Sequence, residues 1–504
     1  MCAIGTHTAR GTDAAVVGLL AALVSIIGAG RPSLWVDEAA TLSAATRPLG
    51  ELRALLAEVD LVHGLYYLLM HGWFSVFPAT EFWLRLPSAL LVGVAAAGVV
   101  MLGAQLSGRA AALAAGVVFA VLPRTTLAGI DGRSYALTMV CAVWLTAVFV
   151  CAVRGGRWWW VGYAVLLALS AVVNVFVLLV ITAHTAMLFA QRSTRTVVAA
   201  WAAAVGAAVL AVAPFLVSVV QQRGQVGWIW PISAVTLGQI FGEQYFPSVY
   251  ADGVRVVGPD QQEFTAEQFG FAVQAWARVA PVIVVLIGIT VLGVLRRRHI
   301  AKPPPRVLLW GCGTWVVAPT VVLVGYSLVD DPLYQPQYLS FTAPALALLV
   351  GYGVVAVGAT RGRITLLLLL IVVAAVPNYI AQRTAYAKFG SDLSEVAALL
   401  SARGSPGECL VVDPGTSPSA VHALEGARLA HPDDLRDVGV ERTARQDDSL
   451  WSARQEVSAA DLRDCAGVWM VGETAGMSAP AGFASVQRWH LNRSQVLHAQ
   501  RPGG

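Results

Sequence analysis

Long apolar runs recur along most of the chain and limit its fold more than any other feature. Eleven segments are apolar enough to be membrane-crossing helices, which need about 20 such residues. Only 13% of the 504 residues are charged, against roughly 25% in soluble domains, so a compact soluble protein is excluded. The sequence predicts an all-α polytopic membrane domain, with crossings near residues 14–30, 86–106, 110–123, 134–152, 158–172, 174–190, 196–219, 279–295, 307–327, 337–357 and 364–382.

The charges between these runs predict which ends face the cytoplasm. With the N-terminus inside, the inner segments carry 13 Lys and Arg and one acid, whereas the outer segments carry 9 Lys and Arg and 14 acids. This asymmetry follows the positive-inside rule, and its strongest anchor is Arg296–Arg298 with Lys302. We therefore predict a multi-pass protein of the cytoplasmic (inner) membrane with a cytoplasmic N-terminus.

The apolar segment 63–77 is the main threat to this orientation. It is only fifteen residues long and contains His63, His71 and two glycines. If it crossed the membrane, every later loop would change side and Arg296–Arg298 would lie outside. We expect it to lie in the interface, or to dip into the membrane and return.

The composition changes after residue 382, and residues 383–504 read as a small α/β domain. Helices are expected at 391–402 and 417–427, and strands at 408–413, 466–472, 483–491 and 494–500. Ser391 has N-capping chemistry for the first of these helices. We predict a boundary between a membrane domain at 1–382 and an extracytoplasmic domain at 383–504. Cys409 and Cys465 can pair in an oxidising compartment, and the sequence leaves this pairing open.

The first outer loop holds the densest set of candidate functional residues. Asp37 and Glu38 follow the first crossing closely, and residues 48–59 have the period of a helix lying on the surface. His63 and Tyr66 come next, and Arg85 opens the second crossing. The net charge of +4 is small, so nucleic acid is not an expected partner.

Five short motifs in a fixed order resemble a known family. They are W-V-D-E at 35–38, D-L-V-H-G-L-Y-Y at 60–67, E-F-W-L-R-L-P-S at 81–88, G-I-D-G-R-S-Y-A-L at 129–137 and Q-Y-L-S-F-T-A-P-A-L at 337–346. Together they resemble the C-type membrane glycosyltransferases (GT-C fold) of the protein O-mannosyltransferase and aminoarabinose-transferase superfamily, and the resemblance covers roughly residues 14–382.

The resemblance implies an enzyme that takes a sugar, such as mannose, from a polyprenyl-phosphate donor. It would transfer that sugar, with inversion, to an extracytoplasmic glycan, lipid or protein acceptor at the cell envelope. Asp37 would be the catalytic base, with Glu38 beside it and Asp131 as a second acid. Arg133 would face the carrier phosphate, and the further substrate-binding candidates are Tyr135, His63, Tyr66, Arg85, Gln337 and Tyr338.

The chemistry of these residue types agrees with such roles. An attacking hydroxyl needs a carboxylate to accept its proton, and a leaving phosphate needs cations. One position departs from the family, because Gln337 stands where a basic residue is frequent and a neutral amide cannot neutralise phosphate. Arg133, Arg124 or Arg85 would then carry that charge. No cofactor is required, although Asp37, Glu38 and Asp131 would also suit Mg²⁺ or Mn²⁺.

Each candidate also has a plainer interpretation. Asp37 can cap a helix that begins at Glu38, and Asp131-Gly132-Arg133 can be a solvated turn. His63 and Tyr66 can be interfacial side chains, and Arg85 a helix-end anchor. For the whole protein, the alternatives are a lipid-linked-sugar transporter or flippase, for which no repeated halves are visible, and a non-catalytic assembly protein.

Overall fold

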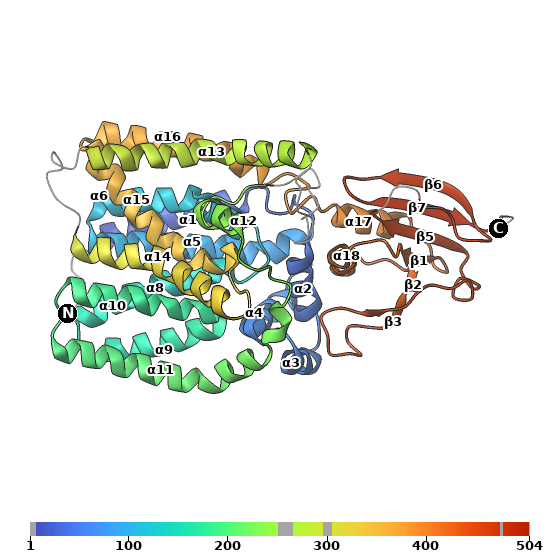
Figure 1. Ribbon diagram of the computed structural model, residues 1–504, viewed down its shortest axis with the longest axis horizontal. Coiled ribbons are helices and arrows are strands. Elements are labelled where there is room, and N and C mark those ends of the chain that lie inside the picture. Colours follow the sequence, from blue (N-terminus) through green and yellow to red (C-terminus); the bar gives the residue numbers. More distant parts are fainter. Residues whose placement is uncertain (1–6, 250–265, 296–304, 474–476, 503–504) are drawn as a thin grey trace. The chain divides into compact units, whose positions relative to one another are not determined.

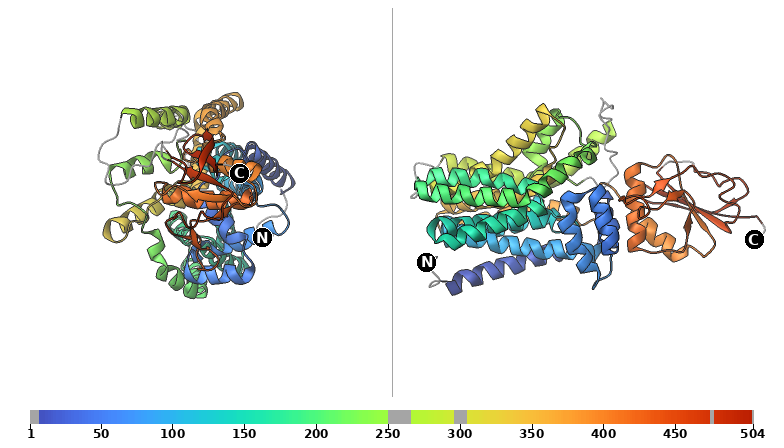
Figure 2. Two further views of the ribbon diagram at one scale, coloured as in Figure 1. Left: turned by 90° about the vertical axis from the view of Figure 1, so that its right-hand side faces the viewer. Right: turned by 90° about the horizontal axis from the view of Figure 1, so that it is seen from below.

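The computed structural model describes residues 7–249, 266–295, 305–473 and 477–502 (Figures 1 and 2). The chain divides into two compact units, which we describe separately. The membrane unit comprises Met1–Ala29, Arg85–Ser248 and Ala275–Ile380. The loop–tail unit comprises Gly30–Leu84, Val249–Gln274 and Ala381–Gly504. The predicted anchor Arg296–Arg298 with Lys302 lies outside the described residues.

Apolar helices that run roughly side by side build the membrane unit (Figures 1 and 2). Among the described residues, seven are long and apolar enough to cross a membrane, and four shorter apolar helices accompany them. Each of the eleven predicted crossings falls on one of these helices. They are α1 (His7–Ile26), α5 (Glu81–Leu106), α6 (Arg109–Val121), α8 (Tyr135–Arg154), α9 (Arg157–Val173), α10 (Val180–Ala190), α11 (Arg195–Gln221), α13 (Ala266–Leu295), α14 (Arg306–Val329), α15 (Ala343–Gly358) and α16 (Arg361–Ala381).

Small residues let some of these helices approach closely. A Cβ added at Gly351 of α15 would lie 2.4 Å from the Ala115 backbone nitrogen in α6. At the contact of α1 with α5, a Cβ added at Gly18 would lie 2.8 Å from the Gly93 carbonyl oxygen. Lipid-exposed helices gain little hydrophobic energy by associating, so such backbone contacts are their usual means of packing.

Short elements connect the long helices within the membrane unit. They are α7 (Pro123–Ala128), η3 (Val175–Leu179), η4 (Arg223–Val226), α12 (Ala234–Gly238), η5 (Gln239–Glu243) and η7 (Pro336–Thr342). Asn174 ends α9, and its side chain accepts a hydrogen bond of 2.9 Å from the Phe176 nitrogen. This turn separates the predicted crossings 158–172 and 174–190.

The first outer loop folds into four short helices of the loop–tail unit. They are α2 (Val36–Ala45), α3 (Leu49–Glu58), η2 (Leu61–His63) and α4 (Gly64–Phe74). Helix α3 confirms the helix predicted over 48–59. Helix α4 has 11 residues, or about 16 Å at 1.5 Å per residue, so it is too short to cross a hydrocarbon core of about 30 Å.

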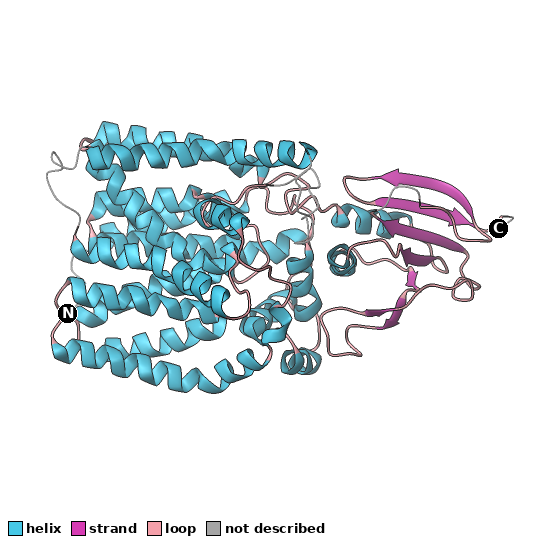
Figure 3. Ribbon diagram, viewed as in Figure 1, coloured by secondary structure: helices cyan, strands magenta, loops and turns pink. Residues whose placement is uncertain are grey.

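The tail forms the small α/β domain that the sequence predicts, and the strands of the described residues all belong to it (Figure 3). A five-stranded sheet has the order β2-β1-β5-β7-β6, and β1 is parallel to both β2 and β5. The elements are α17 (Leu393–Arg403), β1 (Cys409–Val412), α18 (Pro418–Ala430), β2 (Arg436–Asp437), β3 (Val440–Arg442), β4 (Ala453–Arg454), β5 (Gly467–Gly472), β6 (Ala484–His490) and β7 (Gln495–Gln500).

The predicted helices and strands of the tail are confirmed, but the capping role of Ser391 is wrong. Asp392 is the N-cap of α17 and makes no side-chain cap bond. The Ser391 hydroxyl instead donates to the Leu34 carbonyl oxygen at 2.6 Å, and the Ser394 nitrogen donates to Ser33 Oγ at 2.9 Å. The residues before α2 thus supply the capping partner that local sequence was expected to supply.

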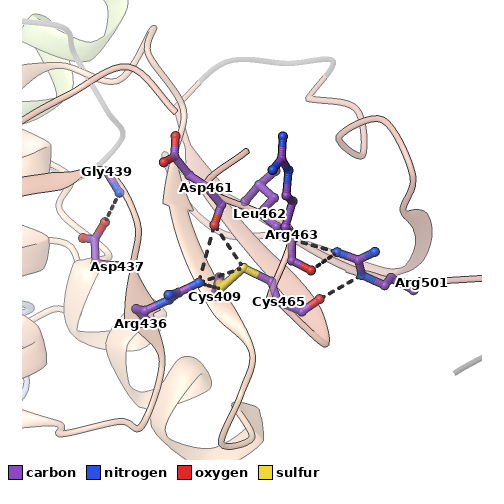
Figure 4. Close-up of a disulfide and its surroundings, with 9 residues drawn as sticks. All are labelled: Cys409, Arg436, Asp437, Gly439, Asp461, Leu462, Arg463, Cys465 and Arg501. Atoms are coloured by element: carbon purple, nitrogen blue, oxygen red, sulfur yellow. Dashed lines mark hydrogen bonds between the residues drawn. A yellow bond between two sulfur atoms is a disulfide. The ribbon is translucent and has the colours of Figure 1, made fainter. Parts of the chain in front are cut away.

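Cys409 and Cys465 form a disulfide that ties β1 to the segment before β5 (Figure 4). The Arg436 guanidinium lies 3.6 Å from one sulfur and 3.7 Å from the other. A disulfide of this kind is typical of proteins that fold in an oxidising compartment.

Candidate active site

The carboxylates of Asp37 and Glu38 lie in the first turn of α2. The helix begins at Val36 and its N-cap is Trp35, so the alternative in which Asp37 caps a helix from Glu38 is wrong. Glu38 is fully buried, whereas Asp37 is half-buried. Backbone N–H groups at a helix N-terminus point towards the side chains of the first turn, where both acids lie.

Helix α18 of the tail domain packs against α2. A Cβ added at Gly426 of α18 would lie 2.3 Å from Ala39 Cβ, so the two backbones are in direct contact. The Ser43 hydroxyl donates to the Leu450 carbonyl oxygen at 2.7 Å, and the buried Arg47 guanidinium donates to the Ser449 carbonyl oxygen. Helices α2 and α18 both belong to the loop–tail unit.

Leu34 and Trp35, just before α2, also contact residues of the tail. The Leu34 nitrogen donates to Ser394 Oγ at 2.9 Å. The Trp35 ring packs against Phe389 with centroids 5.2 Å apart, and the Lys388 ammonium lies 5.6 Å from the Trp35 centroid. The orientation of Asp37 therefore depends on residues at the start of the tail.

His63 and Tyr66 are buried in the same unit, at 8% and 2% exposure. The Tyr67 hydroxyl donates to the Asp60 carboxylate, and the His63 and Tyr67 rings lie 6.0 Å apart. Helix α4, which carries both tyrosines, packs against α2. The loop–tail unit thus gathers four of the predicted site residues, Asp37, Glu38, His63 and Tyr66, around one pair of helices.

In the membrane unit, the buried guanidinium of Arg124 organises a polar cluster. It donates to the carbonyl oxygens of Glu243 and of Gln244, the latter at 2.9 Å. Burial lowers the pKa of Arg124, and the nearby charges of Glu243 and Asp131 partly offset this effect. The carboxylate of Asp131 is therefore within electrostatic reach of a buried cation.

Two tyrosines and an amide complete this cluster. The Tyr245 hydroxyl lies 2.9 Å from Thr342 Oγ1, and the Tyr334 hydroxyl donates to Gln244 Oε1 at 3.2 Å. Burial raises the pKa of Tyr245 to about 12 and also raises that of Tyr334, so both hydroxyls remain protonated donors at neutral pH. The sequence identified Arg124 only as a substitute cation and missed these partners.

Asp131, Arg133 and Tyr135 lie around the start of α8 and are buried, at 5%, 7% and 3% exposure. The Ser88 hydroxyl donates to the Asp131 carbonyl oxygen at 2.7 Å, which fixes the backbone of this turn. Arg85 is fully buried, and its guanidinium donates to the Ala29 carbonyl oxygen at 2.8 Å. The solvated-turn interpretation of 131–133 is therefore wrong.

Gln337 and Tyr338 lie in η7, which packs against α7 and α8 of the membrane unit. Both side chains are half-buried, and the Tyr338 ring stacks on Phe176 with centroids 5.4 Å apart. Through Thr342, the last residue of η7, this segment joins the Arg124 cluster. In the membrane unit, the packing of η7 on α7 and α8 thus brings the predicted residues of segments 131–135 and 337–338 together.

Metal ligation is the remaining question about these acids. Within the described ranges, there is no group of three or more His, Cys, Asp or Glu side chains that would hold a metal ion. A divalent ion bound by Asp37, Glu38 and Asp131 stays a prediction.

Comparison with known proteins identifies the fold. No family model and no curated protein matches the chain. A crystal structure of ArnT from Cupriavidus metallidurans bound to undecaprenyl phosphate superposes with a TM-score of 0.56 at 13% identity, over 96% of this chain and 97% of ArnT. The chain has the fold of ArnT. The apo structure of ArnT gives 0.53 over the same shares.

This likeness confirms the predicted fold class. ArnT is an aminoarabinose transferase with the GT-C fold of polytopic membrane glycosyltransferases. The alignment spans nearly all of both chains, so it includes the tail as well as the membrane helices.

Proposed function

We propose that the protein is a membrane glycosyltransferase that uses a polyprenyl-phosphate-linked sugar as its donor. The acceptor is an extracytoplasmic glycan, lipid or protein. The observation that carries this proposal is the fold shared with ArnT along nearly the whole chain, since ArnT was solved with undecaprenyl phosphate bound. Asp37 and Glu38, in the first turn of α2, supply the carboxylates that glycosyl transfer to a hydroxyl requires.

In the proposed mechanism Asp37 accepts the proton of the acceptor hydroxyl. The oxygen of that hydroxyl bonds to the anomeric carbon while the bond from this carbon to the phosphate oxygen breaks, which inverts the configuration. Polyprenyl phosphate leaves with the electron pair. A positioned base contributes roughly 10²–10⁴-fold to such a step. Glu38 and Asp131 orient the base or the acceptor.

The leaving phosphate needs a cation, and Arg133 is our choice. Its planar guanidinium pairs well with phosphate oxygens. Arg124 is already bonded to two backbone carbonyls, and Arg85 is fully buried against the Ala29 carbonyl. Arg133 thereby also compensates for the neutral Gln337.

Five of the remaining predicted residues bind the substrates in this proposal. His63 and Tyr66, beside α2, face the acceptor, whereas Tyr135, Gln337 and Tyr338 face the donor sugar. Arg85 steadies the start of the second crossing. We propose that the sugar is mannose or another envelope sugar.

We also propose that α2 and the tail lie outside the cytoplasmic membrane. The Cys409–Cys465 disulfide supports this side, because cytoplasmic thiols are kept reduced. The charge asymmetry of the loops supports it independently.

The test is transfer of radiolabelled sugar from polyprenyl-phosphate donors by the purified full chain, with envelope glycans as acceptors. Asp37→Asn should lower the rate by about 10²-fold or more. The matched control is Glu58→Gln, which removes an exposed carboxylate of α3 in the same loop and should leave the rate unchanged. Donor movement across vesicles without a glycosidic product would favour a flippase. Full function of Asp37→Asn in cells would favour a non-catalytic role.

A further inference from the structure

The tail domain contains a cavity of about 290 Å³. Leu410 and Val412 of β1 line one wall, and Val421 and Leu424 of α18 line another. This volume is at the lower end of the range for small-molecule sites, so it suits a ligand about the size of one sugar ring rather than a long glycan.

Charged side chains face these apolar walls as ordered pairs. Arg428 donates to both carboxylate oxygens of Asp433 at 2.7 Å, and Arg454 donates to those of Asp437 at 3.1 and 2.9 Å. Arg428 Nη1 lies 3.7 Å from Asp437 Oδ2, which is longer than a hydrogen bond. Arg428 also donates from Nη2 to the Leu435 carbonyl oxygen at 3.0 Å. Because each guanidinium has five N–H donors, N–H groups of both remain beyond these bonds.

The charge balance of the lining selects the kind of ligand. Three carboxylates, Glu425, Asp433 and Asp437, face two guanidiniums, Arg428 and Arg454. This excess of negative charge disfavours phosphate, sulfate and uronates. A neutral sugar fits instead, because its hydroxyls both donate and accept hydrogen bonds while its C–H face packs on apolar side chains.

Helix α18 connects this cavity to α2. Val421, Glu425 and Arg428 line the cavity and share one helix face at i, i+4 and i+7. Gly426, which contacts Ala39, lies on the other side of the helix. It is two residues before Arg428, and two residues turn an α-helix by about 200°. One face of α18 therefore lines the cavity, and the other supports the helix that carries Asp37.

We propose that this cavity binds one neutral sugar residue of the acceptor glycan. Val421 and Leu429 would contact the C–H face of the sugar, and the Arg428, Arg454 and Asp437 side chains would bond to its hydroxyls. That the sugar belongs to the acceptor rests on the proposed function, whereas the binding of a neutral sugar does not.

The test is saturation-transfer difference NMR on the full chain in detergent micelles, with methyl mannoside, methyl glucoside and methyl arabinoside as probes. Leu429→Trp replaces an exposed leucine of α18 that lines the cavity, and Val440→Trp replaces a half-buried valine of β3 that also lines it. The matched control is Val486→Trp, which changes an exposed side chain of β6 away from the cavity. Both cavity variants should weaken sugar binding by about tenfold, or ~1.4 kcal/mol, while the control binds like wild type.

Binding of no neutral sugar, or equal binding by wild type and both cavity variants, would overturn the proposal. Displacement of the sugar signal by glucuronate or inorganic phosphate at equal concentration would overturn the ligand class. The same variants then separate this inference from the proposed function. If they lose sugar binding but the wild type transfers no sugar, the cavity assignment stands and the transferase fails. If they lose sugar binding but keep full transfer to glycans, the acceptor assignment is wrong.

Discussion

The contact of Gly426 with Ala39 gives a prediction whose size follows from the structure. In Gly426→Ala the new Cβ would lie 2.3 Å from Ala39 Cβ and 2.6 Å from Ala39 Cα. Carbon atoms normally approach to about 3.5–4.0 Å, so the helices must separate by about 1 Å. Overpacking of this kind costs ~1–3 kcal/mol, and the better helix propensity of alanine returns only ~1 kcal/mol.

Gly72→Ala in α4 is the matched control, because a Cβ added there has no atom within 4 Å. It gains the same helix propensity without a clash. The assay is hydrogen exchange of the α2 amides, which reports local opening free energies. Exchange should be faster in Gly426→Ala than in Gly72→Ala by about fivefold or more, since an overpacking cost of ~1–3 kcal/mol corresponds to about 5–150-fold. Equal protection of α2 in the two variants would refute the close packing of α18 on α2.

Three further predictions concern stability. Cys409→Ser should lower the free energy of unfolding of the tail by about 2–4 kcal/mol, measured by denaturant unfolding; an unchanged midpoint would exclude a formed disulfide. Burial, aided by the Arg454 charge, lowers the pKa of His422 from 6.5 to about 4. Between about pH 6.5 and pH 4 the unfolded chain therefore binds a proton at His422 that the folded chain does not, so the stability of the folded chain should fall as the pH is lowered through this range. His422→Phe should reduce the pH dependence of the melting temperature over the same range. An unchanged pH dependence in that variant would contradict the shift. Arg124→Met should leave the carbonyls of Glu243 and Gln244 without this donor and cost about 1–3 kcal/mol in detergent melting experiments. A wild-type melting temperature would count against that cluster.

Much of the fold could be predicted because its signals are local. An apolar run of about 20 residues specifies a crossing without reference to any distant residue. The tail strands at 409–412 and 467–472 were likewise visible as short apolar runs between turns. The tail strands that were missed, β2, β3 and β4, have only two or three residues each, too few to show a period.

Only those site residues that stand in recognisable sequence motifs could be predicted. Asp37, Asp131 and Arg133 stand in motifs whose residue types suggest their chemistry. The partners of Arg124 are backbone carbonyls of residues 243 and 244, and carbonyls leave no mark in a sequence. The capping of α17 from Ser33 and the packing of Gly426 on Ala39 join segments far apart in the chain. Such contacts depend on the tertiary fold, which is why Ser391 was assigned the wrong role.

The central claim is that Asp37 takes a proton while Arg133 holds the donor phosphate, and steady-state kinetics with a labelled polyprenyl-phosphate sugar test it most directly. Asp37→Asn should lower kcat by about 10²-fold or more with little change in the donor KM. Arg133→Met should instead raise the donor KM, because its cation contacts the phosphate in the bound substrate as well as in the transition state. If Asp37→Asn turns over like the wild type, or if Arg133→Met keeps both constants unchanged, the assigned roles are contradicted.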